Sequence, residues 1–301
     1  MPTPPPPGAR VGPRHTVLAR RCAHLYLSAH STSFSLACRL LAPDTRPHVT
    51  AIYAWARVAD EIVDSAEGPG QHDDPTGDAP GRHAASLLAE YRERTYRALA
   101  RGYESDPIVH AFALTARAHG IGERLVEPFF ESMAADLEVC VHTPESLARY
   151  IHGSAEVIGE MCLRTFAGGG LGDDPDTAGG ARALGAAFQK VNFLRDVHED
   201  WYELGRNYLP GRDPAALTDR DLAELTDDID ADLATARRAM AAIPGRDRLA
   251  VRAAHDLFAE LNARLRAAGP AAVCAGRVRV PDARKLALLG RTAATALRSP
   301  A

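Results

Sequence analysis

We predict an all-α protein that folds as a single domain, and three observations support this class. Apolar residues recur at the three- and four-residue spacing of amphipathic helices along most of the chain. No stretch shows the alternation of apolar and polar residues that marks a half-buried strand, and no internal repeat or nucleotide-binding glycine fingerprint occurs. The 301 residues are enough to enclose one large core. One helical domain therefore accounts for the chain.

The composition is that of a globular protein, which we expect to be cytoplasmic. With 46% hydrophobic residues, 25% charged residues and a formal net charge of −4, the chain offers no electrostatic case for nucleic-acid binding. Its five cysteines are odd in number and lack C-x-x-C spacing, as expected of reduced thiols. No run of about 18 uncharged apolar residues predicts a transmembrane helix. Peripheral contact with a membrane stays open, and the sequence predicts no oligomeric state.

The first part of the chain divides into a tail and a helical segment. Residues 1–14 are rich in proline and are expected to form a disordered tail. The helical pattern from residue 15 runs to about residue 41, with an apolar stripe formed by Leu18, Cys22, Leu25 and Tyr26. Serines such as Ser31 are unfavourable inside a helix, so either a helix break or a ligand explains the serine cluster of this segment.

The remaining elements follow from apolar periodicity and from helix-start and helix-stop residues. Residues 65–82 contain seven glycines or prolines and read as an exposed loop, and the glycine run at 168–172 reads as a linker. Further helices are expected at about 45–64, 83–101, 107–119, 123–140, 143–166, 188–200, 219–243 and 246–267.

Two aspartate pairs at four-residue spacing stand out. Asp60 and Asp64 form one pair, and Asp196 and Asp200 form the other, with Asn192 one turn earlier on the same stripe. Residues four apart lie on nearly the same face of a helix, so each pair can present both carboxylates to one ligand. Such pairs are also common on solvated helix faces. Two helices that face each other would instead make a cleft with four carboxylates.

Large apolar neighbours favour burial of both pairs, because neither stretch has the wide polar face of a solvated helix. Two carboxylates about 6 Å apart repel by roughly 3 kcal/mol at an effective dielectric of about 20. Divalent cations are the natural compensation, and carboxylate ligation suits Mg²⁺, with Mn²⁺ as a substitute. Since Mg²⁺ completes its shell with water and phosphate oxygens, a phosphorylated substrate follows.

Six stretches carry a resemblance to a known family. They are SFSLACRLL at 33–41, YAWARVADEIVD at 53–64, YIHGSAEVIGEM at 150–161, FQKVNFLRDVHED at 188–200, GRNYLP at 205–210 and RVRVPDARK at 277–285. In this order they resemble the squalene and phytoene synthase family, and most nearly its bacterial phytoene synthases. The resemblance implies a helical bundle of the isoprenoid synthase type, with about ten helices around a deep central apolar cavity and the two Asp helices at its mouth.

The resemblance also implies the roles of individual residues. Mg²⁺ would be held by Asp60, Asp64, Asp196 and Asp200. Contacts to the prenyl diphosphate would come from Ser31, Ser33, Phe34, Arg57, Gln189, Asn192, Arg195, Arg206 and Arg277. The second leaving group would be oriented by Tyr53 and Tyr208, and Asp136 and Tyr150 match further family positions near the site.

Some of these assignments have alternatives in the residues themselves. Arg57 precedes Asp60 by three residues, so an intrahelical ion pair competes with a contact to diphosphate. The family often has Asp where Glu61 stands, although the metal-facing spacing is kept. Arg277 belongs to a basic patch that either lies on the surface or closes over the phosphates. The small residues Ser154, Ala155 and Gly159 either let two helices approach closely or leave space for a long ligand, and Ala54 is likewise expected to leave room for a C20 chain.

The reaction implied by the resemblance is the head-to-head joining of two geranylgeranyl diphosphates to phytoene, through prephytoene diphosphate and without NADPH, in carotenoid biosynthesis. A C30 synthase that uses farnesyl diphosphate and an enzyme that prenylates an aromatic acceptor remain alternatives. A terpene cyclase is a third, but the upstream aspartate pair argues against it. A catalytically silent binding or assembly protein is the alternative from another class, and the four retained aspartates argue against that.

Overall fold

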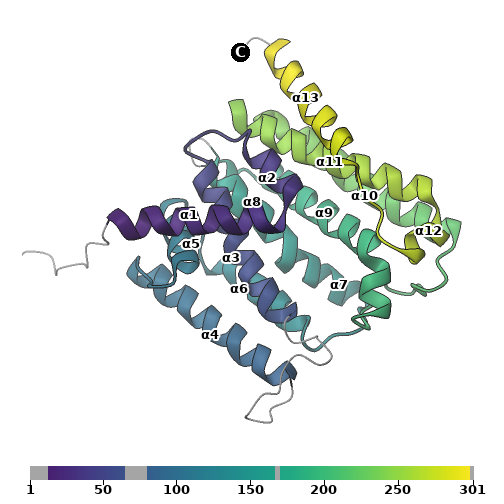
Figure 1. The fold of residues 1–301 in the computed structure, drawn as a ribbon, viewed down its shortest axis with the longest axis horizontal. Helices are drawn as coiled ribbons and strands as arrows, with labels where there is room; N and C mark the ends of the chain where they lie inside the picture. Colours follow the sequence, from purple (N-terminus) through teal and green to yellow (C-terminus); the bar gives the residue numbers. More distant parts are fainter. Residues whose placement is uncertain (1–12, 65–79, 167–169, 299–301) are drawn as a thin grey trace, which may run out of the picture.

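The computed structural model describes residues 13–64, 80–166 and 170–298, and in these ranges the chain is helical without a β-strand (Figure 1). The α-helices are α1 Pro13–His30, α2 Thr32–Cys38, α3 Arg46–Asp64, α4 Pro80–Arg101, α5 Pro107–Ala118, α6 Glu123–Ala135, α7 Pro144–Ile151, α8 Val157–Thr165, α9 Pro175–Tyr202, α10 Asp219–Ala239, α11 Gly245–Ala268, α12 Pro270–Ala275 and α13 Asp282–Arg298. None of them is long and apolar enough to cross a membrane. The predicted all-α class is confirmed.

Several helices begin where the sequence supplies a side-chain acceptor for the free N–H groups of the first turn. Asp106 caps α5 and Asp174 caps α9, each followed directly by a proline that needs no hydrogen-bond partner. Thr143 and Thr218 form capping boxes at the starts of α7 and α10. Local sequence therefore fixes these four starts before any tertiary contact forms.

Several boundaries differ from the sequence prediction. Helix α9 begins at residue 175 instead of about 188, and α12 and α13 follow the last expected helix. The predicted tail lies outside the described residues, apart from Pro13 and Arg14, which open α1. Helix α4 begins at residue 80, inside the predicted loop, and α6 ends at residue 135 instead of 140. The residues 167–169 of the glycine run also lie outside the described residues.

The serine cluster after α1 marks a helix break. Helix α1 stops at His30, and the hydroxyl of Ser31 accepts a hydrogen bond of 3.1 Å from the N–H of Phe34 in α2. The break turns the chain so that α2 packs on α11 and presents Phe34 to the interior. The helix break, one of the two explanations left open by the sequence, is present at Ser31.

The apolar stripe predicted for α1 is only half correct, because Cys22 and Tyr26 pack against the core while Leu18 and Leu25 do not. The helix buries Ala19, Ala23 and Leu27, while Leu18 and Leu25 face outward. Small alanines let α1 lie close against α3 and α5, and a pattern that weights large apolar residues misses such a face.

Two apolar clusters stand on either side of the molecule. The first is formed by residues of α1, α3, α4, α5, α6 and α8 and surrounds Trp55. The ring of Trp55 stacks on Phe112 at 4.0 Å between centroids, and its N–H donates a hydrogen bond to Thr95. The second joins α9 to α12 around residues such as Leu194 and Leu265. Helices α8 and α9 lie between the two, so side chains on their free faces can line a space inside the bundle (Figure 1).

Helices α8 and α9 approach closely because glycines stand at their contact. A Cβ on Gly185 of α9 would lie 2.4 Å from the carbonyl oxygen of Ala155, and a Cβ on Gly159 would lie 2.4 Å from that of Ala181. Real Cβ atoms do not come so near, so both positions require glycine. Close helix approach is therefore one role of the small-residue stripe.

The contact between these helices gives a stability prediction. Gly185→Ala should lower the free energy of unfolding by about 1–3 kcal/mol, because its methyl group would meet a backbone carbonyl that cannot turn away. Gly179→Ala is the matched control on the same helix, since its Cβ would meet nothing nearer than 3.8 Å. Denaturant unfolding of both variants measures the difference. Equal stability of the two variants would contradict the close contact.

Candidate active site

The C-terminal half of α3 gathers one arginine and three carboxylates. The guanidinium of Arg57 forms ion pairs with Asp60 and Glu61. It also lies 3.8 Å from a carboxylate oxygen of Asp64. Spacings of three, four and seven residues put all these side chains on one face of the helix. The intrahelical ion pair considered in the sequence analysis is present, and Glu61 shares it.

The C-terminal end of α9 carries the second acidic group. Arg195 donates hydrogen bonds to its neighbour Asp196, one of them 2.9 Å long from Nε to Oδ1. Arg277, which lies between α12 and α13, approaches the same carboxylate to 3.0 Å and that of Glu199 to 3.9 Å. Of the basic patch, Arg277 therefore reaches the acidic end of α9, whereas Arg284 pairs with Glu260 of α11.

Both acidic groups are held in surroundings that disfavour full ionisation. Partial burial raises the pKa of Asp64 to about 6, and the charge of Asp60 adds to the rise. Burial likewise raises the pKa of Asp200 to about 7, with a further contribution from Asp196. The pKa of Asp60 is raised as well, mainly by burial. The arginines therefore do not fully compensate these carboxylates.

Arg206 links the two acidic groups. Its backbone N–H donates to the carbonyl oxygen of Asp200 at 2.7 Å, and its buried guanidinium donates to the carbonyl oxygen of Asp136 at 2.7 Å. Its positive charge opposes the rise in the pKa of Asp60 and Asp64 on α3 and of Asp200 on α9. Since charges act strongly only at short range, Arg206 lies near both pairs and places them at one end of the bundle.

A buried carboxylate next to Arg206 binds two tyrosines. Asp136 accepts hydrogen bonds from the hydroxyl of Tyr150 at 2.8 Å and from that of Tyr208 at 2.9 Å. Burial is the main cause that raises the pKa of both phenols, and the charge of Asp136 is the second, so both keep their protons. Tyr208 also stacks on Phe193 at 4.5 Å between ring centroids. The tyrosines are thus held as fixed hydrogen-bond donors to Asp136.

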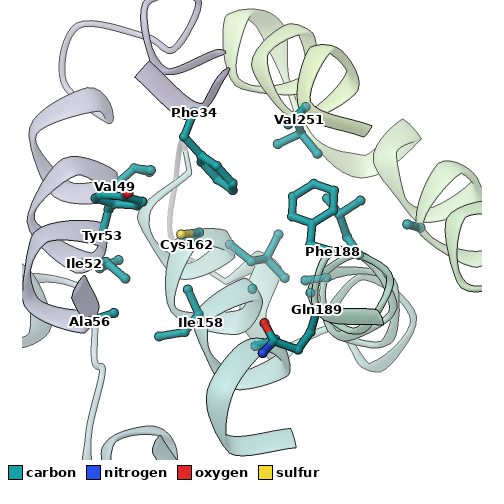
Figure 2. Close-up of a pocket in the computed structure, with 18 of the residues that line it drawn as sticks. Phe34, Val49, Ile52, Tyr53, Ala56, Ile158, Cys162, Phe188, Gln189 and Val251 are labelled. Carbon is teal, nitrogen blue, oxygen red and sulfur yellow. The ribbon is translucent and has the colours of Figure 1, made fainter. Parts of the chain in front are cut away.

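An apolar cavity of about 370 Å³ opens inside the bundle (Figure 2). Its wall comes mainly from α2, α3, α6, α8, α9, α10 and α11, with the aromatic rings of Phe34, Phe188 and Phe258 in contact with one another. The rings of Phe188 and Phe258 stack at 3.8 Å between centroids. In Figure 2, Phe34 lies between Tyr53 on one side and Phe188 on the other, with its ring 5.9 Å from that of Tyr53 and 5.8 Å from that of Phe188 between centroids.

The cavity wall becomes polar in one direction. Along α3 its lining residues change from Val49, Ile52 and Ala56 to Arg57 and Asp60. Along α9 the lining changes in the same way after Thr177 at its start, and its residues in chain order are Thr177, Gly180, Ala181, Leu184, Gly185, Phe188, Gln189 and Asn192. Because both helices become polar toward their C-terminal ends, and these ends carry the acidic groups, the cavity leads from an apolar interior to the charged end.

Three polar atoms on the cavity wall have no hydrogen-bond partner among the described residues. They are Oδ1 of Asn192, Oγ of Ser154 and Nε of Arg57, and all three are buried. A buried polar atom without a hydrogen-bond partner lowers the stability of the folded state by about 1–3 kcal/mol. A ligand in the cavity that bonded to these atoms would remove this cost. Ser154 sits in the π-helical turn His152–Glu156 between α7 and α8, where its side chain turns into the cavity.

The structure divides the predicted site residues into two sets. The cavity is lined by Phe34, Tyr53, Arg57, Asp60, Gln189 and Asn192. The predicted residues outside its lining are Ser31, Asp64, Arg195, Asp196, Asp200, Arg206, Tyr208 and Arg277. The side chain of Ser33 lies outside the described residues. Ser154 was expected only as part of the small-residue stripe, and its hydroxyl was given no role. Phe258 was missed, because a phenylalanine in a helical apolar pattern looks like an ordinary core residue.

The donor set fits a metal ion only together with a ligand. In the ranges 13–64, 80–166 and 170–298, no three or more His, Cys, Asp and Glu side chains form a group that could hold a metal ion. Mg²⁺, however, is usually bound by one or two carboxylates plus phosphate oxygens and water. Each acidic helix offers two carboxylates with this chemistry, and the free Oδ1 of Asn192 is a further oxygen donor. The residues therefore suit Mg²⁺ that is bound together with a diphosphate.

A family model described as squalene/phytoene synthase matches residues 27–284. The chain belongs to the squalene/phytoene synthase family. It is accordingly a prenyltransferase, of the type that condenses prenyl units head to head. The predicted family is confirmed, and bacterial phytoene synthases are among the relatives.

Individual relatives agree with this assignment. A 15-cis-phytoene synthase from Paracoccus sp. (strain N81106 / MBIC 01143) is 30% identical over 273 residues, which cover 86% of each chain. A presqualene diphosphate synthase from Zymomonas mobilis is 32% identical over 192 residues, covering 62% of this chain and 58% of the relative. The crystal structure of a dehydrosqualene synthase superimposes with a TM-score of 0.77 at 19% identity, covering 95% of this chain and 99% of that one, and confirms the isoprenoid synthase fold.

The raised pKa of Asp200 predicts how stability changes with pH when divalent cations are absent. A carboxyl with a higher pKa in the folded state binds its proton more tightly there, so its contribution to stability is complete below the unfolded pKa of about 4. That contribution is lost as the pH rises through about 7. Asp200→Asn cannot ionise and should therefore lose less melting temperature than the wild type between about pH 5 and pH 8.

Comparison of the two proteins isolates Asp200 from other titrating groups, such as His48, whose pKa burial lowers to about 4. Asp227→Asn is the control, because this carboxylate is exposed and pairs only with Arg266 among the described residues. Thermal unfolding followed by circular dichroism at several pH values gives the profiles. Parallel profiles for the wild type and Asp200→Asn would show that Asp200 titrates normally.

Proposed function

We propose that the protein joins two molecules of geranylgeranyl diphosphate head to head to form phytoene, through the cyclopropyl intermediate prephytoene diphosphate, with Mg²⁺ and without NADPH. The observation that carries the proposal is the cavity that leads from an apolar interior to the charged C-terminal ends of α3 and α9. A prenyl diphosphate has the same division into a long apolar chain and a charged head. The name of the Paracoccus relative supports the choice of phytoene as product.

The charged end would bind the diphosphate. Asp60, Asp64, Asp196 and Asp200 would hold magnesium, or manganese in its place, which when bound supplies positive charge to the departing diphosphate. Arg57, Arg195 and Arg277 pair with these carboxylates in the structure and present forked N–H donors that suit phosphate oxygens. Asp136 keeps the hydroxyls of Tyr150 and Tyr208 in place beside this end.

The apolar part of the cavity would protect the reacting chain. Departure of the diphosphate leaves an allylic cation, which water would destroy. The apolar wall excludes water, and the faces of Phe34, Phe188 and Phe258 carry the partial negative charge of an aromatic ring. A nearby cation is attracted to such faces. The same wall therefore both shields the cation and stabilises it before a proton is lost.

The length of the prenyl chain is the finer part of the proposal. Ala155 and Gly159 line the cavity and add little bulk to its wall, which favours a C20 chain. Ala54, which the sequence analysis would also count as giving room, is fully buried and does not line the cavity. A C30 reaction with farnesyl diphosphate is the second candidate, because one relative is named presqualene diphosphate synthase.

Product analysis tests the substrate. The purified protein with geranylgeranyl diphosphate and Mg²⁺ should yield phytoene without NADPH, identified by chromatography and mass spectrometry. Farnesyl diphosphate should react more slowly, because its shorter chain fills less of the cavity. Removal of divalent cations with excess chelator is the control and should stop turnover. A C30 hydrocarbon or presqualene diphosphate as sole product would assign the shorter substrate instead.

Substitution of the aspartates tests the proposed ligands. Asp60→Asn and Asp196→Asn keep the shape of the side chain and remove its charge, so each should lower kcat at least about a hundredfold. Little loss of fold stability is expected. Asp227→Asn removes an exposed carboxylate of α10 and serves as the matched control. Turnover near the wild-type value in either active-site variant would remove that residue from the proposed metal site.

A further inference from the structure

Helix α1 exposes large apolar side chains on its outer face. The exposed fractions are 51% for Val17, 55% for Leu18 and 67% for Leu25. Leu18 and Leu25 are seven residues apart and so lie on one stripe, with Val17 beside them. The other large apolar residues exposed in the described part of the chain are Tyr103, Val141, Tyr202 and Leu286, on different elements. No other described helix presents three of them.

The same outer face is basic. Arg14 and Arg21 lie on it among the apolar residues, Arg20 stands at its edge, and α1 contains no Asp or Glu. Elsewhere in the fold many exposed arginines pair with carboxylates, but none of these three forms an ion pair or hydrogen bond with a described residue. A chain with a formal net charge of −4 therefore carries one uncompensated positive helix face.

The inner face of α1 is firmly packed, so this arrangement is a fixed feature of the surface. Ala19, Ala23 and Leu27 are buried against α3, α5 and α2. Figure 1 shows α1 at the outside of the bundle and α2 directly after it. Because α2 carries Phe34 of the cavity wall, the outer face lies on the helix that directly precedes this part of the wall.

We propose that the outer face of α1, formed by Arg14, Val17, Leu18, Arg21 and Leu25, docks the protein on an anionic lipid bilayer. Helices that lie in a membrane interface have this composition, with apolar side chains that enter the boundary of the acyl chains and arginines that meet the lipid phosphates. Long arginine side chains can reach the headgroups while their stems stay beside the leucines. Docking follows from the surface of α1 alone and does not depend on the proposed substrate.

Charge favours the bilayer over a second copy of this chain. A symmetric dimer through α1 would bring the same arginines of both copies together, and no carboxylate of α1 is present to compensate them. A bilayer with phosphatidylglycerol offers negative charge over the whole contact. The lipid surface is therefore the partner that satisfies both the arginines and the leucines.

Vesicle binding by the full-length protein tests the proposal. We expect co-sedimentation with phosphatidylcholine vesicles that contain about one third phosphatidylglycerol, weaker binding in high salt, and little binding to phosphatidylcholine alone. Leu18→Asp/Leu25→Asp should weaken the binding at least about tenfold, because two inserting side chains are lost. Arg21→Gln should weaken it severalfold and reduce its salt dependence.

Leu286→Asp is the matched control, since Leu286 is 59% exposed on α13 beside basic residues, and this variant should bind as the wild type does. Unchanged melting temperatures show that the variants are folded. If Leu18→Asp/Leu25→Asp does not fold, Arg21→Gln still tests the proposal. Absence of binding to anionic vesicles, or an equal loss in Leu286→Asp, would overturn the proposal. So would a wild-type dimer in sedimentation velocity that the α1 variants dissociate, because the face would then bind a second copy.

Discussion

The charge balance at the C-terminal ends of α3 and α9 is the constraint on which the rest of the structure depends. Carboxylates from two helices are brought together in partly buried surroundings, and Arg57, Arg195, Arg206 and Arg277 lie among them. Burial without such partners would cost several kcal/mol per charge. The compensation is incomplete, because the pKa of Asp200 stays raised to about 7. Further positive charge would therefore be accommodated here without rearranging the fold.

Helix α9 has to pack closely against its neighbours in its first half and carry the charged residues of the site in its second half. Its first half is rich in glycine and alanine, so that Gly185 can touch the backbone of the π-helical turn and Gly180 can lie against Ala239 of α10. Its second half carries the polar and acidic side chains. Close packing at one end holds the helix between the two apolar clusters, and this fixes where the acidic end lies. The geometry of the site is thus set by glycines well away from its charges.

Local spacing made much of the fold and site predictable. The aspartate pairs and Arg57 lie as their spacing predicts, because three- and four-residue steps determine which side chains share a helix face. The cluster of Asp136, Tyr150 and Tyr208 was beyond such reasoning, since its hydrogen bonds join residues 14 and 72 positions apart. The orientation of α1 was only partly predicted for a related reason: Cys22 and Tyr26 do pack on the core, but alanines form the centre of the buried face, and only the packed structure reveals that small side chains were needed there.

The orientation of α1 also bears on how the surface of the protein relates to its cavity. A helix that buries two alanines and leaves two leucines partly exposed loses hydrophobic stabilisation relative to the reverse arrangement, since each leucine forgoes part of the about 1.5–3 kcal/mol that full burial provides. Such an arrangement is stable only because close approach to α3 and α5 requires the alanines, and the exposed leucines then need water or a partner. The cavity of an enzyme for amphiphilic substrates must also separate apolar from charged groups, because its apolar wall has to end at charged residues. A lipid interface divides apolar from charged groups in the same way, and a protein that lies on it can exchange such molecules without exposing their chains to water.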